Sequence, residues 1–270
     1  MPGPDEISVQ QLARLIGTLD QPYIIDVRPQ EDRDADRFLM PCARVASHLV
    51  PEAALPAFLN PAGPARPIAV TCYKGGKFAQ GAAALLRTMG HRAEVIEGGW
   101  AAWRAAGLPV IGADVRDQAL WVTRHRPKVD RIACPWLIRR FVNPEARFLY
   151  VAPSAVLEVA DKFGAIPFDI EGVPHSHVGE TCTFDTLLDL FGLHSDALAR
   201  MALVIRAADT DMHGLAPQAA GLLAISVGLS RQFRDDLEQL QAGMVVYDAL
   251  YRWARDGFEE SHDWPAGRPA

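Results

Sequence analysis

The chain has 270 residues, of which 49% are hydrophobic and 22% charged, and its formal net charge is −6. This composition is typical of a globular protein with room for two domains, and the acidic balance argues against a general affinity for nucleic acid. Residues 1–10 contain neither the basic nor the apolar region of a secretory signal peptide. No apolar run approaches the ~18 residues that a membrane helix needs. The sequence therefore predicts a cytoplasmic protein without membrane contact.

The first half of the chain alternates short apolar strands with helices. Strands are expected at 22–28, 67–70 and 93–96, and helices at 7–20, 77–90 and 98–107. The charged residues 29–38 must lie in solvent, and the proline-rich residues 51–67 predict a loop with one short helix around 53–58. This alternation predicts an α/β domain with a doubly wound parallel sheet, which closes near Gly112.

A linker at 112–117 leads to a second unit with a different pattern. Residues 120–141 predict a strand and then a helix, and strands at 147–151 and 165–170 bracket a helix at 154–164. Further helices are expected at 183–191, 195–208, 217–229 and 234–255, and the polar residues 259–270 are expected to fray. We thus predict an α+β, mostly helical second domain, with domain bounds of 1–112 and 118–258.

The four cysteines are widely spaced and form no Cys-x-x-Cys pair. Because disulfides are rare in the cytoplasm, a chain of this size is expected to keep them as reduced thiols. The four residues are Cys42, Cys72, Cys134 and Cys182.

Cys72 ends an apolar strand and precedes a helix, with Gly75 and Gly76 between them. Ligands bind at the carboxyl ends of the strands in a doubly wound sheet, and backbone N–H groups that converge at a helix N-terminus attract anions. Such a loop, with Lys74 or Lys77 nearby, also favours a thiolate. Cys72 is therefore a candidate nucleophile, and the alternative is a small buried thiol at a strand end.

Residues 7–112 resemble a rhodanese domain in the motifs IIDVR, VTCYKGGKFAQGAAALLRTMG and VIEGGWAAWRAAGLPV, which stand in the order and at the spacing of that family. The resemblance implies a sulfurtransferase in which Cys72 takes sulfane sulfur from thiosulfate or a persulfide and passes it to a thiol acceptor. It also implies that the backbone from Tyr73 to Lys77 forms an anion-binding cradle. Related phosphatase-like domains use a longer loop for phosphate or arsenate, so this loop length favours sulfur.

Two positions depart from the rhodanese pattern. The family usually ends the loop with Arg and then Ser or Thr, whereas this chain has Lys77 and Phe78. Lysine cannot hold a sulfonate with two parallel hydrogen bonds as arginine does, and phenylalanine removes a hydroxyl donor. We therefore expect persulfide formation with weak thiosulfate turnover. Asp26 and Arg28 match the Asp-x-Arg of the family and are expected to form a structural ion pair.

Residues 120–255 resemble the C-terminal region of ChrB-type chromate-resistance proteins. The matching stretches are WVTRHRPKVDRIACPWLIRRFVNPEARFLY, GAIPFDIEGVPHSHVGETCTFDTLL, IRAADTD and APQAAGLLAISVGL. The resemblance implies handling or sensing of chromate, in some members as transcriptional regulators. Those regulators carry a different N-terminal segment, which is expected to bind DNA, so nucleic acid is not an expected partner of this chain.

Residues 116–147 are basic, with eight lysines and arginines against three acids. A local positive field suits a small oxyanion such as chromate or sulfate, and Arg124, Lys128 and Arg131 are the candidate contacts. Cys134 is a further candidate: because proline favours the first turn of a helix, Pro135 makes Cys134 a possible N-cap thiol with a lowered pKa. The alternatives are an ordinary solvated face and a buried, inert thiol.

The stretch PHSHVGETC and the later stretch RAADTDMH offer several metal-binding side chains. Imidazole, carboxylate and thiolate together suit zinc or another first-row divalent metal. Neither HExxH nor a paired CxxC spacing is present, so the alternative that these residues cap helices stays open. The candidate ligands are His177, Glu180, Cys182, Asp209 and Asp211, with His175 and His213 close by.

The sequence leaves two main functions open, while a third, a cysteine phosphatase or arsenate reductase, is disfavoured by the length of the loop. The first is a persulfide-forming sulfurtransferase coupled to a domain that handles or senses chromate or a similar oxyanion. The second is a non-catalytic chromate- or metal-binding sensor or regulatory protein, which Lys77 and Phe78 favour. Sulfur loading on Cys72 separates the two.

Overall fold

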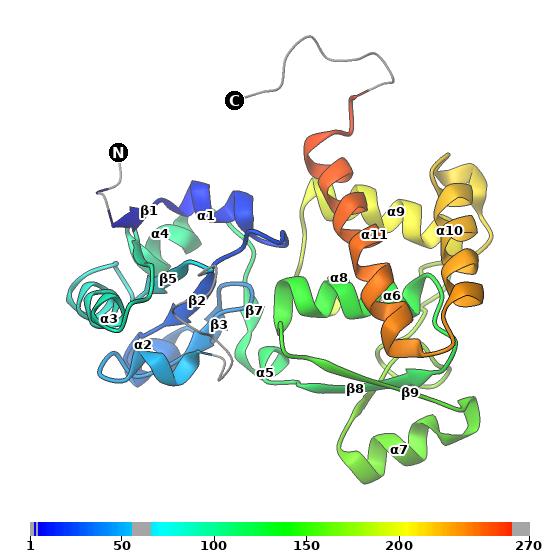
Figure 1. Cartoon of the computed structure of the whole chain (residues 1–270), viewed down its shortest axis with the longest axis horizontal. Coiled ribbons are helices and arrows are strands. Elements are labelled where there is room, and N and C mark those ends of the chain that lie inside the picture. The colour runs from blue at the N-terminus through cyan, green and yellow to red at the C-terminus, as the bar shows by residue number, and fades with distance from the viewer. Residues whose placement is uncertain (1–2, 4, 56–65, 261–270) are drawn as a thin grey trace.

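The computed structural model describes residues 3, 5–55 and 66–260, which fold into two units lying side by side (Figure 1). Five strands of the N-terminal unit form one sheet in the order β1-β6-β5-β2-β4, and every pairing in it is parallel. The predicted doubly wound parallel sheet is confirmed. The strands are β1 (Glu6–Ile7), β2 (Tyr23–Asp26), β4 (Arg44–Val45), β5 (Ile68–Thr71) and β6 (Ala93–Ile96).

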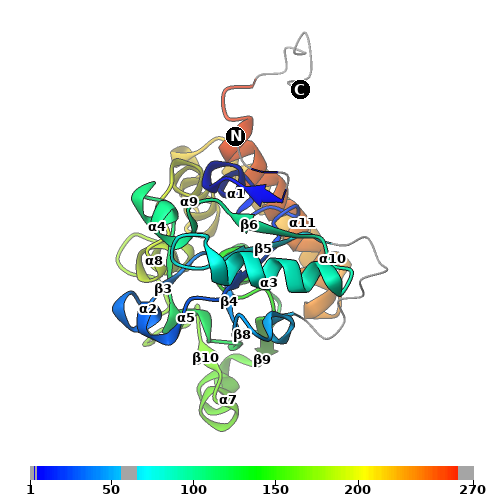
Figure 2. The ribbon, with the colours of Figure 1, turned by 90° about the vertical axis from the view of Figure 1, so that its left-hand side faces the viewer.

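Helices cover both faces of this sheet. Because successive strand residues point to opposite faces, Ile24 packs into the core beneath α1 (Val9–Leu15) and α4 (Gly99–Ala105), whereas Ile25 packs into the core beneath α3 (Lys77–Thr88). Figure 2 shows α3 lying across the front of the sheet. Burial on both faces explains why the strands are continuously apolar.

The other N-terminal elements are short. The charged stretch forms α2 (Gln30–Ala35), which has no buried residue. The pair β3 (Phe38–Leu39) and β7 (Ile111–Gly112) is antiparallel, and the predicted linker contains α5 (Ala113–Arg116). A 3₁₀ helix covers Pro51–Ala54, whereas the second half of the helix predicted at 53–58 lies outside the described residues.

The first predicted helix was too long at both ends. Ile7 pairs with Ile96 in the sheet, and the side chain of Ser8 caps α1 by accepting a hydrogen bond from the Gln11 N–H. After α1 the chain turns at Gly17, whose φ is +78°. A strand residue and a capping serine therefore supplied apolar and polar positions that fitted helical spacing by chance.

The C-terminal unit contains a three-stranded parallel sheet in the order β10-β8-β9, with helices around it. No helix in the described ranges is long and apolar enough to cross a membrane. The predicted mostly helical α+β domain is confirmed, while 261–270 lie outside the described residues. The strands are β8 (Leu120–Arg124), β9 (Arg147–Val151) and β10 (Ile166–Pro167), and the helices are α6 (Asp130–Leu137), a π-helix (Ile138–Val142), α7 (Val156–Phe163), α8 (Thr183–Phe191), α9 (Asp196–Asp209), α10 (Ala219–Gln232) and α11 (Asp236–Asp256), with 3₁₀ turns at Pro153–Ala155 and His213–Leu215.

Cys134 does not cap a helix, which corrects one of the two alternatives drawn from the sequence. Helix α6 begins at Asp130, so Cys134 lies inside it and is fully buried, and burial raises the pKa of its thiol. Pro135 has no N–H for the Arg131 carbonyl oxygen, and the Tyr150 hydroxyl donates to that oxygen instead, at 2.9 Å. A substitute donor thus lets the proline stand beyond the first turn.

The two units share one hydrophobic core. Ile16 and Trp103 of the first unit belong to the same buried cluster as Phe141 and Tyr251 of the second. Gly17 packs so closely here that a Cβ atom on it would lie 2.4 Å from the Phe141 ring. The units are therefore packed against each other through apolar surface as well as joined by the chain.

Candidate functional site

The Cys72 loop lies between three elements. Cys72 directly follows β5, and Gly76 is the N-cap of α3. The backbone N–H of Trp100 donates to the Cys72 carbonyl oxygen at 3.0 Å, and that of Ala101 donates to the Tyr73 carbonyl oxygen at 2.9 Å. The loop is thus fixed by the end of β5, the start of α3 and the first turn of α4.

Two glycines make this close approach possible. Gly75 and Gly99 have φ values of +68° and +59°, a region that residues with a Cβ atom rarely adopt. A Cβ atom on Gly99 would lie 2.3 Å from the Cys72 carbonyl oxygen, and one on Gly75 would lie 2.6 Å from the Ile96 carbonyl oxygen. Only glycine fits at either position, so backbone contacts determine where Cys72 lies.

The Cys72 thiol is buried in a loop whose two lysines are exposed. Cys72 is 4% exposed, and its Sγ lies 4.0 Å from the Gly76 carbonyl oxygen. The Lys77 Nζ lies 5.1 Å from the centre of the Phe78 ring, which packs against the His48 ring at 4.5 Å. Of the predicted cradle residues, Tyr73, Lys74 and Lys77 are exposed, Gly76 is half-buried and Gly75 is buried.

Asp26 and Arg28 form a buried ion pair at the end of β2. The guanidinium donates to the Asp26 carboxylate through Nε at 2.8 Å and pairs with it through a terminal nitrogen at 2.7 Å. It also donates to the Phe38 carbonyl oxygen at 2.7 Å and lies 4.2 Å from the centre of the Trp100 ring. The pair therefore braces α4, to which the Cys72 loop is bonded.

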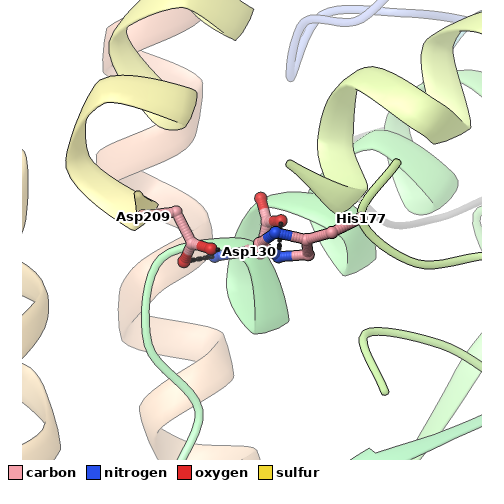
Figure 3. Close-up of side chains that lie close together, drawn as sticks. All are labelled: Asp130, His177 and Asp209. Atoms are coloured by element: carbon pink, nitrogen blue, oxygen red, sulfur yellow. Dashed lines mark hydrogen bonds and ion pairs between the residues drawn. The ribbon is translucent and has the colours of Figure 1, made fainter. Parts of the chain in front are cut away.

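A second constellation lies in the C-terminal unit, where side chains from separate elements converge on His177. Its Nε2 lies 3.3 Å from an oxygen of Asp169, 3.3 Å from an oxygen of Asp209 and 3.5 Å from an oxygen of Asp130. Figure 3 shows the side chains of Asp130, His177 and Asp209 close together. Ligand atoms of Asp130, His177 and Asp209 all lie within 4.8 Å of one another, so these residues could hold a metal ion.

Burial and repulsion perturb this cluster. Desolvation raises the pKa of Asp130 and of Asp209, and the neighbouring carboxylates raise it further. The pKa of His177 is raised chiefly by its hydrogen bond to Asp169. Burial also acts to raise the pKa of Asp169, but His177 and two arginines outweigh it and hold that pKa below its usual value. Burial and mutual repulsion thus disfavour the charged forms of Asp130 and Asp209, and a cation beside them would favour these forms.

Arg124 and Arg131 connect the cluster to the basic segment. One Asp169 oxygen lies 3.0 Å from a terminal nitrogen of Arg124 and 3.2 Å from Nε of Arg131. Arg131 and Lys128 also line a cavity of about 340 Å³, whereas Arg124 lines a separate cavity of about 290 Å³ beside His177. The larger cavity has no carboxylate among its lining residues, which are His125, Arg126, Lys128, Arg131, Val227, Ser230 and Arg231.

The remaining metal candidates are not part of the triad that could hold an ion. Glu180 is exposed, and the Asp211 side chain is 91% exposed and lies 3.7 Å from His213. Cys182 is the N-cap of α8, and its thiol donates to Asp185 at 3.2 Å. Of the five candidates, the structure brings together only His177 and Asp209.

Asp130 and Asp169 complete the cluster and were missed in the sequence. Each stands as a lone carboxylate beside apolar residues, in KVDRIACPW and AIPFDI. Because buried aspartates need partners, these two contexts were the available signal. Asp130 is far from His177 in sequence, and Asp169 is joined to it by a loop whose path the sequence does not define, so the tertiary fold was needed to connect them.

Two family models divide the chain. A model of the rhodanese-like domain matches residues 8–106, and a model of the C-terminal domain of ChrB matches residues 121–254. The chain combines a rhodanese-like domain with a ChrB C-terminal domain. Both matches fall inside the bounds 1–112 and 118–258, which stay predictions.

The ChrB C-terminal domain also has a curated relative. Over 132 residues the chain is 37% identical to Protein ChrB of Cupriavidus metallidurans. This match covers 48% of the chain and 39% of that protein. The chain therefore matches well under half of the length of its relative.

Solved structures similar to the chain include three proteins, each with a TM-score of 0.32. A rhodanese-related protein from Thermoplasma volcanium is 19% identical and is matched over 39% of this chain and 96% of its own. SSP1007 from Staphylococcus saprophyticus is 24% identical and is matched over 38% of this chain and 97% of its own. RPA3614 from Rhodopseudomonas palustris is 24% identical and is matched over 39% of this chain and 83% of its own. Its name describes it as a protein of unknown function and a possible tyrosine phosphatase. No functional assignment follows at these similarities.

Proposed function

We propose that the rhodanese-like domain is a sulfurtransferase that carries sulfane sulfur as a persulfide on Cys72. The observation that carries this proposal is the place of Cys72, at the carboxyl end of β5 and directly before the loop that opens α3. Helix N-termini stabilise anions through their free N–H groups and the helix dipole. An anionic leaving group is favoured at this position.

The proposed reaction exchanges one S–S bond for another. The Cys72 thiolate attacks the sulfane sulfur of thiosulfate, the S–S bond of the donor breaks, and sulfite leaves with the bonding electron pair. A thiolate acceptor then attacks the outer sulfur of the persulfide and releases the Cys72 thiolate. Lys74 and Lys77 are exposed beside the loop and attract anionic donors. No outside oxidant or reductant is needed.

The side chains of Lys77, the last cradle residue, and of Phe78, which follows it, favour a persulfide donor over thiosulfate. Phe78 packs against His48 and supplies no hydroxyl donor, and the Lys77 ammonium lies near the Phe78 ring. A lysine also binds a sulfonate less specifically than an arginine does. Apolar surface beside the thiol suits an organic persulfide better than a doubly charged inorganic anion.

Turnover measurements test this proposal. Sulfite release from thiosulfate and sulfur transfer from a persulfide should both be lost in Cys72→Ser, whereas Cys42→Ser, at an equally buried thiol, should keep the wild-type rates. The double variant Lys77→Arg/Phe78→Ser should turn over thiosulfate faster. Wild-type rates in Cys72→Ser would overturn the proposal.

The ChrB C-terminal domain supports a second proposal, the binding of a small oxyanion such as chromate. The observation that favours it is the cavity of about 340 Å³ lined by Lys128, Arg131 and three further basic residues, without a lining carboxylate. A concave site lined by one sign of charge raises the local concentration of the opposite ion. The protein would then be associated with chromate resistance, either as a sulfurtransferase or as a non-catalytic sensor.

Calorimetry with chromate and sulfate tests the oxyanion proposal. The double variant Lys128→Ala/Arg231→Ala should bind at least tenfold more weakly, whereas Lys162→Ala, at the end of α7, should bind as the wild type does. Equal affinity in all three proteins would contradict the proposal. Chromate binding by a protein in which Cys72 never loads sulfur would favour the sensor.

The partners proposed on these grounds are a small sulfur donor, a thiol acceptor and chromate. The cytoplasmic location and the absence of nucleic-acid and membrane partners stay predictions from the sequence.

A further inference from the structure

Neither proposed activity uses the acidic cluster, which consists of Asp130, Asp169, His177 and Asp209. Asp130 begins α6, Asp169 follows β10, His177 precedes α8 and Asp209 ends α9. The fold thus brings three carboxylates from separate elements within 3.5 Å of one imidazole nitrogen.

The charges in this cluster are not balanced by the protein. Asp169 has Arg124 and Arg131 as partners. Among the described residues, Asp130 and Asp209 form no ion pair with a lysine or arginine, and their side chains are 1% and 19% exposed. A buried carboxylate stays ionised only beside a positive charge or a bound metal and otherwise takes up a proton, and one imidazole cannot neutralise both. A divalent cation would balance the charge of the two ionised carboxylates.

An unsatisfied atom points to the same conclusion. One Asp130 oxygen accepts a hydrogen bond from the Thr183 N–H at 2.5 Å, whereas Oδ1 is buried and has no hydrogen-bond partner in the described part of the chain. The other oxygen of the same carboxylate lies 3.5 Å from His177 Nε2, and Figure 3 shows Asp130, His177 and Asp209 close together. Buried acceptors without partners are rare and costly, and a cation in the cluster would satisfy this one.

The spacing of the ligand atoms fits an octahedral ion. Neighbouring ligands of an ion with bonds of ~2.1 Å lie about 3 Å apart, and opposite ligands lie about 4.2 Å apart. The distances from His177 Nε2 to the carboxylate oxygens are 3.3–3.5 Å, and the ligand atoms of the triad span at most 4.8 Å. Contraction by a few tenths of an ångström is enough to form the site.

We infer that Asp130, His177 and Asp209, with Asp169 beside them, bind a divalent cation of the Mn²⁺ class. Carboxylates suit Mg²⁺, Ca²⁺ and Mn²⁺, whereas imidazole suits first-row transition metals, and Mn²⁺ accepts both kinds of ligand. The thiol of Cys182 donates a hydrogen bond to Asp185, so no thiolate is among the proposed metal ligands. On binding, His177 Nε2 gives up its proton to solvent and becomes a ligand.

Titration of the chelator-treated full chain with MnCl₂ tests this inference. Calorimetry should give one Mn²⁺ per chain, and the electron paramagnetic resonance signal of free Mn²⁺ should fall in step. Asp209→Asn should weaken binding more than tenfold. The matched control is Asp211→Asn, which changes an exposed carboxylate two residues further on and should bind as the wild type does. The absence of stoichiometric binding, or equal affinities in the two variants, would overturn the inference.

A second variant separates loss of the site from loss of the fold. His177 is 39% exposed, so His177→Gln should fold normally by circular dichroism. It should reduce the preference for Mn²⁺ over Mg²⁺, because only the imidazole distinguishes the two ions here. Mn²⁺ should also raise the melting temperature of the wild type and not that of Asp209→Asn. An unchanged preference for Mn²⁺ in His177→Gln would contradict the role of the imidazole.

Discussion

The variant Arg28→Lys should be clearly less stable than the wild type and should still load sulfur on Cys72. The guanidinium is fully buried, contacts the Asp26 carboxylate through two nitrogens, donates to the Phe38 carbonyl oxygen and lies over the Trp100 ring. Lysine keeps the positive charge but cannot form two parallel hydrogen bonds or stack as a plane. The substitution therefore removes the paired hydrogen bonds and the stacking contact but keeps the positive charge.

The contacts at Arg28 set the size of the effect. One lost hydrogen bond to the buried Asp26 carboxylate costs about 1.5–3 kcal/mol, and the Phe38 carbonyl oxygen left without its donor costs about 1–3 kcal/mol. A desolvated cation–π contact with Trp100 adds up to ~2 kcal/mol. Because lysine restores part of each contact, we expect the free energy of unfolding to fall by about 2–4 kcal/mol.

Urea denaturation followed by circular dichroism measures this loss. Arg92→Lys is the control, because that side chain is 68% exposed and pairs with Glu94 at the surface, where ion pairs contribute less than about 1 kcal/mol. A loss below about 1 kcal/mol in Arg28→Lys would contradict a stabilising role for the buried pair. Unchanged stability together with abolished sulfur loading would place Asp26 and Arg28 in the chemistry.

Three further predictions follow from the geometry. Gly99→Ala should lower stability in urea by more than the ~1–2 kcal/mol of the left-handed backbone and should slow sulfur loading, because its Cβ atom would overlap the Cys72 carbonyl oxygen. Gly107→Ala, where φ is +63° and the space is open, should lose only the backbone penalty, so equal losses would contradict the argument. At pH 8 iodoacetamide should modify Cys72 before Cys42, because burial raises the pKa of Cys42 to about 12 and keeps the Cys42 thiol protonated. Peptide mass spectrometry that shows Cys42 modified first would contradict this prediction. Mn²⁺ should tighten the binding of sulfate, a non-oxidising analogue of chromate, about fivefold or more, because a cation in the acidic cluster offsets the carboxylates that face Arg131; calorimetry showing unchanged or weaker binding would refute this coupling.

The N-terminal fold could be predicted because its signals are local. Buried parallel strands are short apolar runs, and Gly90, with a φ of +88°, directly follows the C-cap residue of α3. The loop around Cys72 was visible in the same way, since strand, glycines and helix follow one another along the chain. What the sequence could not predict is the contact between Gly99 and the Cys72 carbonyl oxygen, because it joins two segments through space.

The C-terminal domain was harder to predict because distant residues override local patterns. Pro135 pointed to a helix start, but Tyr150 from β9 supplies the donor that lets α6 begin earlier. The ligands beside His177 were hidden for the same reason, since Asp130 and Asp169 reach it only through the packing of α6 and the sheet. The sequence shows which residues are charged or can bind a metal, but it does not show that Asp130, Asp169 and His177 lie together in the fold.

Intact mass spectrometry after incubation with thiosulfate or a polysulfide is the most direct test of the central claim. We predict that the wild-type chain gains the mass of one sulfur atom and that a reductant such as dithiothreitol removes it. Cys72→Ser should gain nothing under the same conditions. A wild-type chain that gains no sulfur from either donor, or a Cys72→Ser variant that gains as much as the wild type, would contradict the assignment of Cys72 as a sulfur carrier.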